Sequence, residues 1–520
     1  MVSNPSSLED IDAEKNAEDQ NDTPPGTSQQ FPADQSATQA TGASLDHETK
    51  RSEEHIVDWE KDDPSNPKNF PFWYKNWITF QLGMLALAAS AASAIISSAS
   101  DRISARFNIS QEVTVLNVSL FIIGFAVGPL LWAPVSELFG RKWSILPAMY
   151  VLALFSIGTA TSQTPAAMFI TRFFGGCFGS APVSNVSAAL GDLYAPKARG
   201  IAMSLYAVAV VGGPTLSPVI GAGIVTNPAL SWRWVEYISA IWVSAVTTLA
   251  LFCMPELYAP VLLKRKAQRL RKSTGDTRYW HPHEENKLDF NSIVTKHLSR
   301  PLLMLTTEPM VTCIAFYASF VYGLLYLSLQ VFPIVFSEDR EWPLVVSTLP
   351  FLGLFVGVLA ALGVNLGFQP RYARIVDLNK GRAVPEGRLA PMVVGGFLFA
   401  IGLFWFGWTA APSIPWPAPV VATAFIGAGF NIIFQQCLNF LVDTYGLYAA
   451  SAVSANTFLR SILAAGLPMA ARPMFHTLGV GPAMSILGGV ACLALPVPFL
   501  FMRYGLRLRK MSKFAPVVED

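Results

Sequence analysis

Two arginines lie deep inside long apolar segments of this chain, and they are the natural starting point for its chemistry. Of the 37 Lys and Arg residues, only Arg172 and Arg460 fall well within such segments. An arginine keeps its proton in a protein and is costly in an apolar environment, so each must face a polar cavity or a partner. We therefore expect either a functional charge or a structural tie to backbone carbonyls at each position.

The same segments contain no Asp, Glu or His at mid-depth. The nearest carboxylates lie at segment edges and helix ends: Glu236 at one edge, and Glu137, Asp192, Glu256, Glu308 and Asp443 at the other. A carboxylate can exchange a proton at physiological pH when its surroundings favour it, whereas an arginine cannot. Any proton-carrying role is therefore expected at an edge acid. Glu308, beside an apolar segment, and Asp192, on the segment of Arg172, are the leading candidates.

Residues 133–142, A-P-V-S-E-L-F-G-R-K, connect two apolar segments and combine one acid with two bases. Glu137 lies four and five residues before Arg141 and Lys142, and Gly140 permits a tight turn between them. One role open to these residues is a charge latch at a helix end that breaks during a conformational change. The general excess of Lys and Arg on the cytoplasmic side would explain Arg141 and Lys142, but neither Glu137 nor Gly140.

A later apolar segment carries an ordered set of backbone-modifying residues, Gly213, Pro214, Pro218 and Gly221. Prolines a turn apart remove two backbone donors and favour a bent helix, while glycines let a neighbouring helix approach closely. Both residue types are common in membrane helices, so the information lies in their spacing.

Two polar stripes follow helical spacing and so fall on single helix faces. Their members are Tyr322, Tyr326 and Gln330 on one segment, and Asn431, Gln435 and Asn439 on another. Phenols and amides on an apolar wall suit bulky, amphipathic, mostly neutral small molecules. Hydrogen bonding between helices is the alternative role for these side chains.

The segments that must position these residues are membrane spans. The chain is 52% hydrophobic and only 14% charged, too little charge to coat soluble domains. Twelve stretches are long and apolar enough to cross a bilayer. They are residues 77–98, 113–133, 144–163, 166–190, 201–225, 235–257, 306–330, 343–367, 390–410, 417–441, 449–472 and 479–502.

The loops between these spans predict the topology. With the N-terminus in the cytoplasm, and leaving residues 1–76 aside, the loops and the C-terminal tail hold 24 Lys and Arg on the inner side against five on the outer side, which places both termini inside. We expect five regions: an acidic, disordered N-terminal tail with a short pre-membrane segment (1–76), a six-helix half (77–257), a basic cytoplasmic loop (258–305), a second six-helix half (306–503) and a cytoplasmic tail (504–520).

Several other functions are disfavoured. The five cysteines lie in apolar segments and suggest neither disulfides nor a metal site, and no metal-binding spacing occurs. The basic cluster at residues 264–272 suits anionic lipid headgroups rather than nucleic acid. Asn108-Ile109-Ser110 is a glycosylation sequon, so Asn108 is a candidate attachment site on the outer side.

Several stretches together resemble the major facilitator superfamily, in particular its fungal twelve-span drug:proton antiporters. Residues 133–142 are similar to the superfamily's cytoplasmic loop motif, 172–176 (R-F-F-G-G) to its fourth-span motif and 213–221 (G-P-T-L-S-P-V-I-G) to its antiporter motif. Ser217 replaces a glycine of the last motif. Further similar stretches are 57–67, 232–234, 255–260, 442–446 and 455–460.

This resemblance implies an all-α membrane protein with twelve transmembrane helices in two pseudo-symmetric halves, the major facilitator fold. It implies a proton-coupled efflux transporter rather than an enzyme. Arg172 would take part in proton coupling, with Arg460 and the loop motif in coupling or conformational change, and the proton gradient would supply the energy without a cofactor. The alternative is a facilitator or importer of a nutrient such as a polyamine or vitamin.

The expected partners are a small-molecule substrate, protons and membrane lipids, for a protein working as a monomer. The expected location is the plasma membrane, with the vacuolar membrane as second choice.

Overall fold

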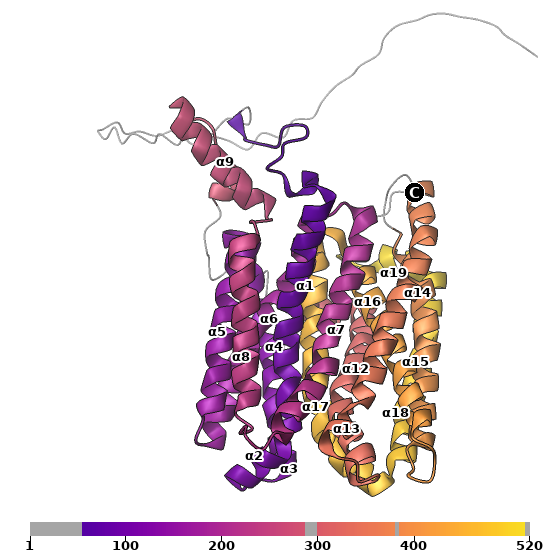
Figure 1. Ribbon diagram of the computed structural model, residues 1–520. Coiled ribbons are helices and arrows are strands. Elements are labelled where there is room, and N and C mark those ends of the chain that lie inside the picture. Colours follow the sequence, from indigo (N-terminus) through magenta and orange to yellow (C-terminus); the bar gives the residue numbers. More distant parts are fainter. Residues whose placement is uncertain (1–54, 286–298, 380–383, 515–520) are drawn as a thin grey trace, which may run out of the picture. The chain divides into compact units, whose positions relative to one another are not determined.

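The computed structural model describes residues 55–285, 299–379 and 384–514, and within these ranges the named elements are all helices, apart from one isolated β-bridge between Ile56 and Trp280 (Figure 1). The first group of helices comprises α1 (Phe72–Ala94) with its continuation η3 (Ile95–Ala99), α2 (Ser100–Phe107), α3 (Gln111–Thr114), α4 (Leu116–Phe139), α5 (Arg141–Thr161), α6 (Pro165–Leu193), α7 (Pro196–Thr226) and α8 (Trp234–Cys253). The second group comprises α11 (Arg300–Thr307), α12 (Pro309–Phe332) with its continuation η6 (Pro333–Glu338), α13 (Leu344–Thr348), α14 (Pro350–Leu378), α15 (Leu389–Thr409), α16 (Pro417–Tyr445), α17 (Ala449–Leu478), α18 (Val480–Ala494) and α19 (Pro496–Met511).

Ten helical stretches of the described chain are long and apolar enough to span a membrane. The two further spans expected from the sequence correspond to α6 and α17, with 29 and 30 residues. Both are long enough to cross the hydrocarbon core at 1.5 Å per residue. Each carries a buried arginine and many small or polar residues, which lower its hydropathy, so the twelve-helix arrangement is consistent with the ten apolar stretches.

Helix ends differ from the expected spans where proline and capping residues decide them. α14 continues to Leu378, so the first half of the expected loop 368–388 is helical. The last expected span, 479–502, is divided at Leu495 into α18 and α19, because Pro496 begins a new helix. The expected central loop contains the helix α9 (Ala259–Thr274) as well as α11. Residues 1–54, 286–298, 380–383 and 515–520, including most of the predicted disordered tail, lie outside the described residues.

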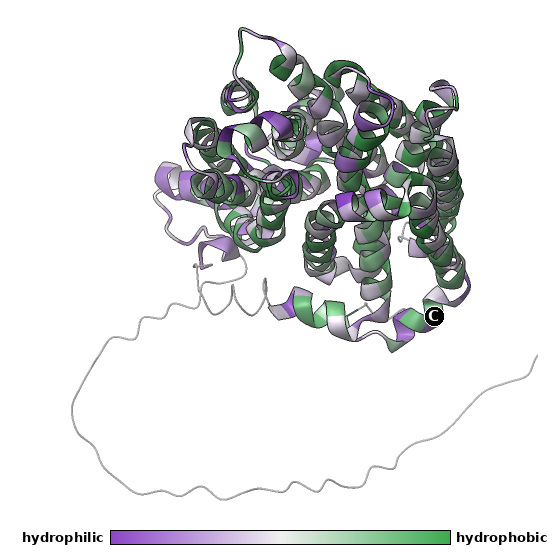
Figure 2. Cartoon of the chain, turned by 90° about the horizontal axis from the view of Figure 1, so that it is seen from below, coloured by the Kyte–Doolittle hydropathy of each residue, from purple (hydrophilic) through white to green (hydrophobic). Residues whose placement is uncertain are grey.

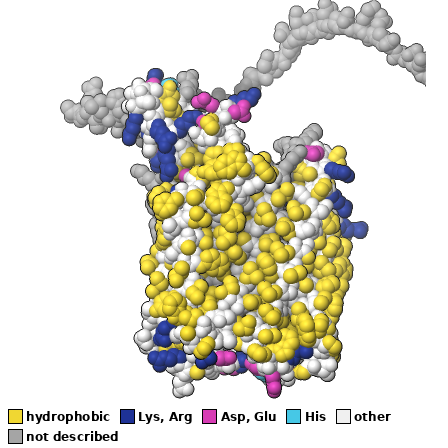
Figure 3. Space-filling view, in the orientation of Figure 1, with side chains coloured by type: hydrophobic (Ala, Val, Ile, Leu, Met, Phe, Trp, Pro, Cys, Tyr) yellow, Lys and Arg dark blue, Asp and Glu magenta, His cyan; other side chains and the backbone are white. Residues whose placement is uncertain are grey.

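The bundle has two ends, which we name by what they carry (Figure 1). The tail face carries α9 and the end of α19, and the distal face carries α2, α3 and α13. Hydrophobic side chains cover the side of the bundle, while Lys and Arg gather near both ends (Figure 3). Seen along the bundle, its helices are predominantly hydrophobic (Figure 2). Such an apolar belt is what a lipid-facing surface requires.

Two buried apolar clusters form the core. One is drawn wholly from residues between Ile78 and Leu257. The other comes mainly from residues between Met304 and Phe501, and it includes side chains of α1, α4, α7 and α8. The two groups of helices also pack directly, α4 against α17 and α7 against α14. Some of the functional residues described below, among them Tyr326, Gln435 and Asp443, lie along this junction.

Helix α9 is docked on the segment that precedes α1. Lys266 forms an ion pair with Asp63 at 2.8 Å and lies over the ring of Trp59, and Val57 packs with Leu263. The hydrogen bond from Lys266 holds the pKa of Asp63 below its usual range. Other basic residues of α9, among them Arg265, remain exposed.

Candidate functional site

A fully buried ion pair lies within the first group of helices. The Nη1 atom of Arg172, on α6, is 3.1 Å from Oε1 of Glu236, on α8, and the two side chains are 1% and 0% exposed. Arg172 also donates to the carbonyls of Ala92, Ser93 and Asn117 at 2.8–2.9 Å, and its guanidinium lies 4.3 Å from the ring centroid of Phe121. Arg172 thus ties α6 to backbone carbonyls of α1 and α4 and has an acid partner, while its role in proton coupling stays a prediction.

Glu236 remains the edge carboxylate that the sequence predicts, but its side chain is fully buried, which the sequence did not indicate. Glu236 is in the first turn of α8, close to the distal face, as its sequence position suggests. However, side chains on a helix lean toward its N-terminus, and α6 also begins at the distal face, so Arg172 reaches toward Glu236. Its second oxygen, Oε2, has no hydrogen-bond partner among the described residues.

A short chain of contacts connects this pair to the second group of helices. Ser93, whose carbonyl accepts from Arg172, shares a hydrogen bond of 2.9 Å with the hydroxyl of Tyr326 on α12. The rings of Tyr326 and Tyr322 are 5.3 Å apart, and the guanidinium of Arg460, on α17, lies 4.5 Å from the ring centroid of Tyr322. The structure therefore brings the tyrosine stripe and both predicted arginines together through a serine that sequence reasoning missed.

The amide stripe of α16 lies in a buried polar network. Asn365, on α14, donates to Gln435 at 2.6 Å and accepts from Gln436 at 2.8 Å, and Gln435 donates to Ser204 on α7. The remaining stripe residues bond less directly: Asn439 donates to Gln436 at 3.5 Å, and Asn431 to the carbonyl of Val358 at 3.3 Å. In this conformation the stripe joins helices, which was the alternative role, and its part in substrate binding stays a prediction.

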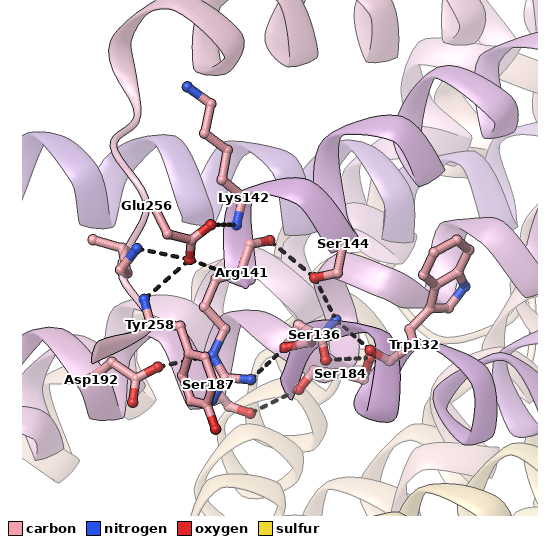
Figure 4. A network of polar contacts seen from close by, with 12 residues as sticks. Trp132, Ser136, Arg141, Lys142, Ser144, Ser184, Ser187, Asp192, Glu256 and Tyr258 are labelled. Atoms are coloured by element: carbon pink, nitrogen blue, oxygen red, sulfur yellow. Dashed lines mark hydrogen bonds and ion pairs between the residues drawn. The ribbon is translucent and has the colours of Figure 1, made fainter. Parts of the chain in front are cut away.

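The loop motif forms a compact network at the tail face (Figure 4). Gly140 adopts a left-handed φ of +99°, and a Cβ there would collide with the carboxylate of Glu256. That carboxylate accepts from the backbone amides of Arg141 at 2.7 Å and Lys142 at 3.2 Å, at the N-terminus of α5. An acid is favourable there because the first amides of a helix lack partners.

The side chains of this motif bond within the first group of helices. Arg141 pairs with Asp192 at 2.8 Å, and Lys142 donates to the carbonyl of Leu251 at 2.7 Å. Glu137, at the end of α4, is half-buried. In this conformation the motif links α5 to α6 and to the end of α8, and its role as a latch stays a prediction.

Asp443 provides a connection between the two groups of helices at the tail face. It accepts from Arg388 at 3.0 Å and from Tyr372 at 2.8 Å, and it pairs with Arg199 of α7 at 3.5 Å. Glu308, which with Asp192 is a leading candidate for the proton carrier, accepts a hydrogen bond from the hydroxyl of Tyr445 at 3.2 Å.

Glycines 213 and 221 of α7 lie directly against α1. A Cβ on Gly213 would come within 2.5 Å of the amide nitrogen of Ala91, and one on Gly221 within 2.6 Å of the carbonyl oxygen of Ile95. The hydroxyl of Ser98 donates to the carbonyl of Pro218 at 2.7 Å. Despite Pro214 and Pro218, α7 is one continuous helix. The motif therefore provides close packing of α1 and α7.

A cavity of about 470 Å³ lies at the distal end of the junction. It is lined by side chains from both groups of helices, including Gln330, Asp101, Glu338, Arg472 and His476. Gln330 is partly exposed to this cavity, whereas Tyr322 and Tyr326, on the same helix, are fully buried. Asn108 is exposed at the C-terminus of α2, on the same face. At the tail face the pair of Asp443 and Arg199 joins the two groups of helices, and at the distal face the junction is hollowed.

Comparison with known proteins agrees with this architecture. The sequence model of the family "Major Facilitator Superfamily" matches residues 82–468 of this chain. The chain is 40% identical over 460 residues to the "Major facilitator superfamily multidrug transporter FLU1" of Candida albicans, covering 88% of this chain and 75% of that protein. It is 42% identical over 468 residues to the "Citrinin biosynthesis cluster MFS transporter mrr1" of Monascus ruber, covering 89% and 93%. It is 40% identical over 463 residues to the "Efflux pump bik6" of Gibberella fujikuroi, covering 88% and 95%.

Solved structures show the same fold. The xylose transporter XylE of E. coli, in a partially occluded inward-open conformation, aligns with a TM-score of 0.58 at 18% identity, covering 83% of this chain and 98% of that one. The human organic anion transporter MFSD10 aligns with a TM-score of 0.56 at 16% identity, covering 82% and 100%. The architecture is that of a multi-pass membrane transporter rather than an enzyme. The chain belongs to the Major Facilitator Superfamily.

Proposed function

We propose that this chain is a proton-coupled efflux transporter that exports small amphipathic compounds by alternating access. The names of its relatives, a multidrug transporter and an efflux pump, support export. The close packing of Gly213 and Gly221 on α1 supports the interpretation of this stretch as an antiporter motif. We place the protein in the plasma membrane as a monomer, with the tail face in the cytoplasm and α9 near anionic lipid headgroups.

With this orientation, the conformation described is outward-facing. The tail face is closed by Asp443 and Arg199 and by the hydrogen bond from Gln435 to Ser204. The distal cavity would then be the outer vestibule, through which a compound leaves and a proton enters. Transport requires a second conformation in which the tail-face contacts between the two halves break and the distal cavity closes.

The buried pair of Arg172 and Glu236 is the observation that carries the proposal of proton coupling. Glu236 is the acid that pairs with a charge fully inside the bundle, and its Oε2 atom is free to take a proton. Protonation would remove the charge that holds Arg172, while the same guanidinium holds α1 through the carbonyls of Ala92 and Ser93. A change at Glu236 can thus reach Tyr326 in the other half through Ser93. Glu236 therefore replaces Asp192 and Glu308 as the leading proton carrier.

The test uses purified full-length protein in proteoliposomes with an imposed pH gradient. The probes are naphthalene-2-sulfonate, naphthalene-2-sulfonamide and N-methylquinolinium, so that an anion, a neutral compound and a cation of similar size are each followed. Wild-type protein should concentrate at least one of them, and a protonophore should abolish that accumulation. Glu236→Gln should still exchange labelled for unlabelled probe but should no longer concentrate it.

Glu341→Gln, at an exposed position beside the distal face, and Glu308→Gln and Asp192→Asn, at the tail face, are measured in the same assay. All three should retain accumulation driven by the pH gradient. If Glu236→Gln concentrates the probe normally, the proton is carried elsewhere, and failure of Glu308→Gln or Asp192→Asn alone would identify that acid. Accumulation that never exceeds equilibrium, with or without a gradient, would instead support the facilitator alternative.

A further inference from the structure

Arg460 is a buried cation without a balancing acid. Its side chain lies in α17 and the residue is only 3% exposed. Its Nε atom has no hydrogen-bond partner, and no ion pair joins it to a carboxylate within the described ranges. A charge buried in this way is costly unless another group compensates it, so the site lacks an anionic component.

Aromatic rings form the surroundings of this charge. The guanidinium lies 4.5 Å from the ring centroid of Tyr322 and 5.0 Å from that of Phe434. These two rings stack at 5.7 Å, and Phe430 stacks on Phe434 at 5.9 Å. Rings from α12 and α16 thus make a flat apolar wall beside a fixed positive charge, a surface suited to a planar apolar body.

A second unsatisfied polar group lies one helical turn away. Neither the amide nitrogen nor the amide oxygen of Asn456 has a hydrogen-bond partner in the part of the chain that the structure describes, although this residue is fully buried. Residues four apart on a helix lie on the same face, so Asn456 and Arg460 project from one side of α17. In the core of a folded protein, buried polar groups nearly always have hydrogen-bond partners. Two buried groups without partners on neighbouring turns of one helix face therefore indicate a site for a polar ligand.

We propose that Arg460 binds the anionic group of the transported compound, so that the substrates are amphipathic anions carrying a carboxylate, sulfonate or phenolate on an aromatic body. This inference rests on the proposed transport function and specifies its substrate class. It differs from the expectation of mostly neutral substrates, which considered only the amides and phenols. Arg172 cannot take this role, because its donors are directed at Glu236 and three carbonyls.

Binding of charged and neutral probes to purified full-length protein tests the proposal without a gradient. Equilibrium binding of naphthalene-2-sulfonate, naphthalene-2-sulfonamide and N-methylquinolinium is compared in detergent solution. Wild-type protein should bind the sulfonate roughly tenfold or more tightly than the sulfonamide, and the quinolinium most weakly. Arg460→Gln should lose this preference and bind sulfonate and sulfonamide alike, whereas Arg460→Lys should retain part of it because it keeps the charge.

Arg374→Gln removes an exposed arginine of α14 and serves as the matched control, with the wild-type preference expected. Sulfonamide binding by Arg460→Gln reports that its aromatic wall is intact. Equal or weaker sulfonate binding in wild-type protein, no sulfonate binding, or a preference that survives in Arg460→Gln would each overturn the proposal. These results do not depend on a proton gradient, so failure of proton coupling would be seen separately in the proteoliposome assay.

Discussion

Arg172 and Arg460 have the same residue type and similar burial, but opposite surroundings. Arg172 donates to three backbone carbonyls and pairs with Glu236. Arg460 faces aromatic rings and has neither an acid partner nor an acceptor for Nε within the described chain. The donors of Arg172 have partners without a ligand, whereas the Nε donor of Arg460 does not. Burial alone therefore does not separate a structural charge from a ligand-binding one; the state of the hydrogen-bonding groups does.

The largest effect should come from removing the satisfied arginine. Arg172→Met leaves Glu236 buried without its partner, so the free energy of unfolding should fall by about 3–5 kcal/mol, and transport should be lost. Reversible unfolding in detergent measures the first and proteoliposome transport the second. Adding Glu236→Leu to this variant should recover much of the stability, because no unpaired charge remains. A double variant less stable than Arg172→Met would contradict this account of the pair.

A shared acid at the tail face should have an intermediate effect. Asp443→Asn weakens the contacts with Arg388 and Arg199 and should cost about 2 kcal/mol. Because Arg199 belongs to the other group of helices, the tail face should open more often. Labelling of a cysteine placed at Ser204 measures this opening and should be faster in Asp443→Asn than in an otherwise identical protein with Asp443. An unchanged labelling rate would show that the contact between Asp443 and Arg199 does not keep the tail face closed.

Removing the unsatisfied arginine should change stability in the opposite direction. Arg460→Met replaces an uncompensated charge with an apolar side chain of similar length, and we expect a gain of about 1–2 kcal/mol in the free energy of unfolding. The measurement is the same unfolding experiment used for Arg172→Met. A loss as large as that of Arg172→Met would mean that Arg460 has a structural partner.

The smallest effect should come from breaking the hydrogen bond between Ser93 and Tyr326, which connects the surroundings of Arg172 to those of Arg460. Ser93→Ala removes the hydrogen bond to Tyr326 but keeps the carbonyl that accepts from Arg172. Stability should change by about 1 kcal/mol or less. The rate of transport driven by the pH gradient should fall several-fold while probe affinity stays the same. Tyr326→Phe removes the same hydrogen bond from the other side, so its stability and its transport rate should match those of Ser93→Ala. A difference in probe affinity between the two variants would show that the Tyr326 hydroxyl contacts the substrate.

The sequence predicted the elements well. Long apolar stretches and the positions of Lys and Arg in loops are local properties, so they indicated the spans, the similarity to the superfamily and both interior arginines. It also indicated the loop motif, but not that Arg141 pairs with Asp192 or that Glu256 accepts from the backbone amide of Arg141. Glu256 could have been suspected as a lone carboxylate at the end of a span, but its partner lies 115 residues away.

What the sequence determined by itself is therefore the kind of molecule: an all-helical membrane transporter with rare charges inside it. The tertiary structure decided which of those charges are satisfied. Arg172 meets Glu236 across 64 residues because α6 and α8 both start at the distal face and their side chains lean the same way. Arg460 remains without such a partner because the side chains that surround it, from α12 and α16, are aromatic. Pairing depends on distances between separate helices, and neither composition nor spacing along the chain contains those distances.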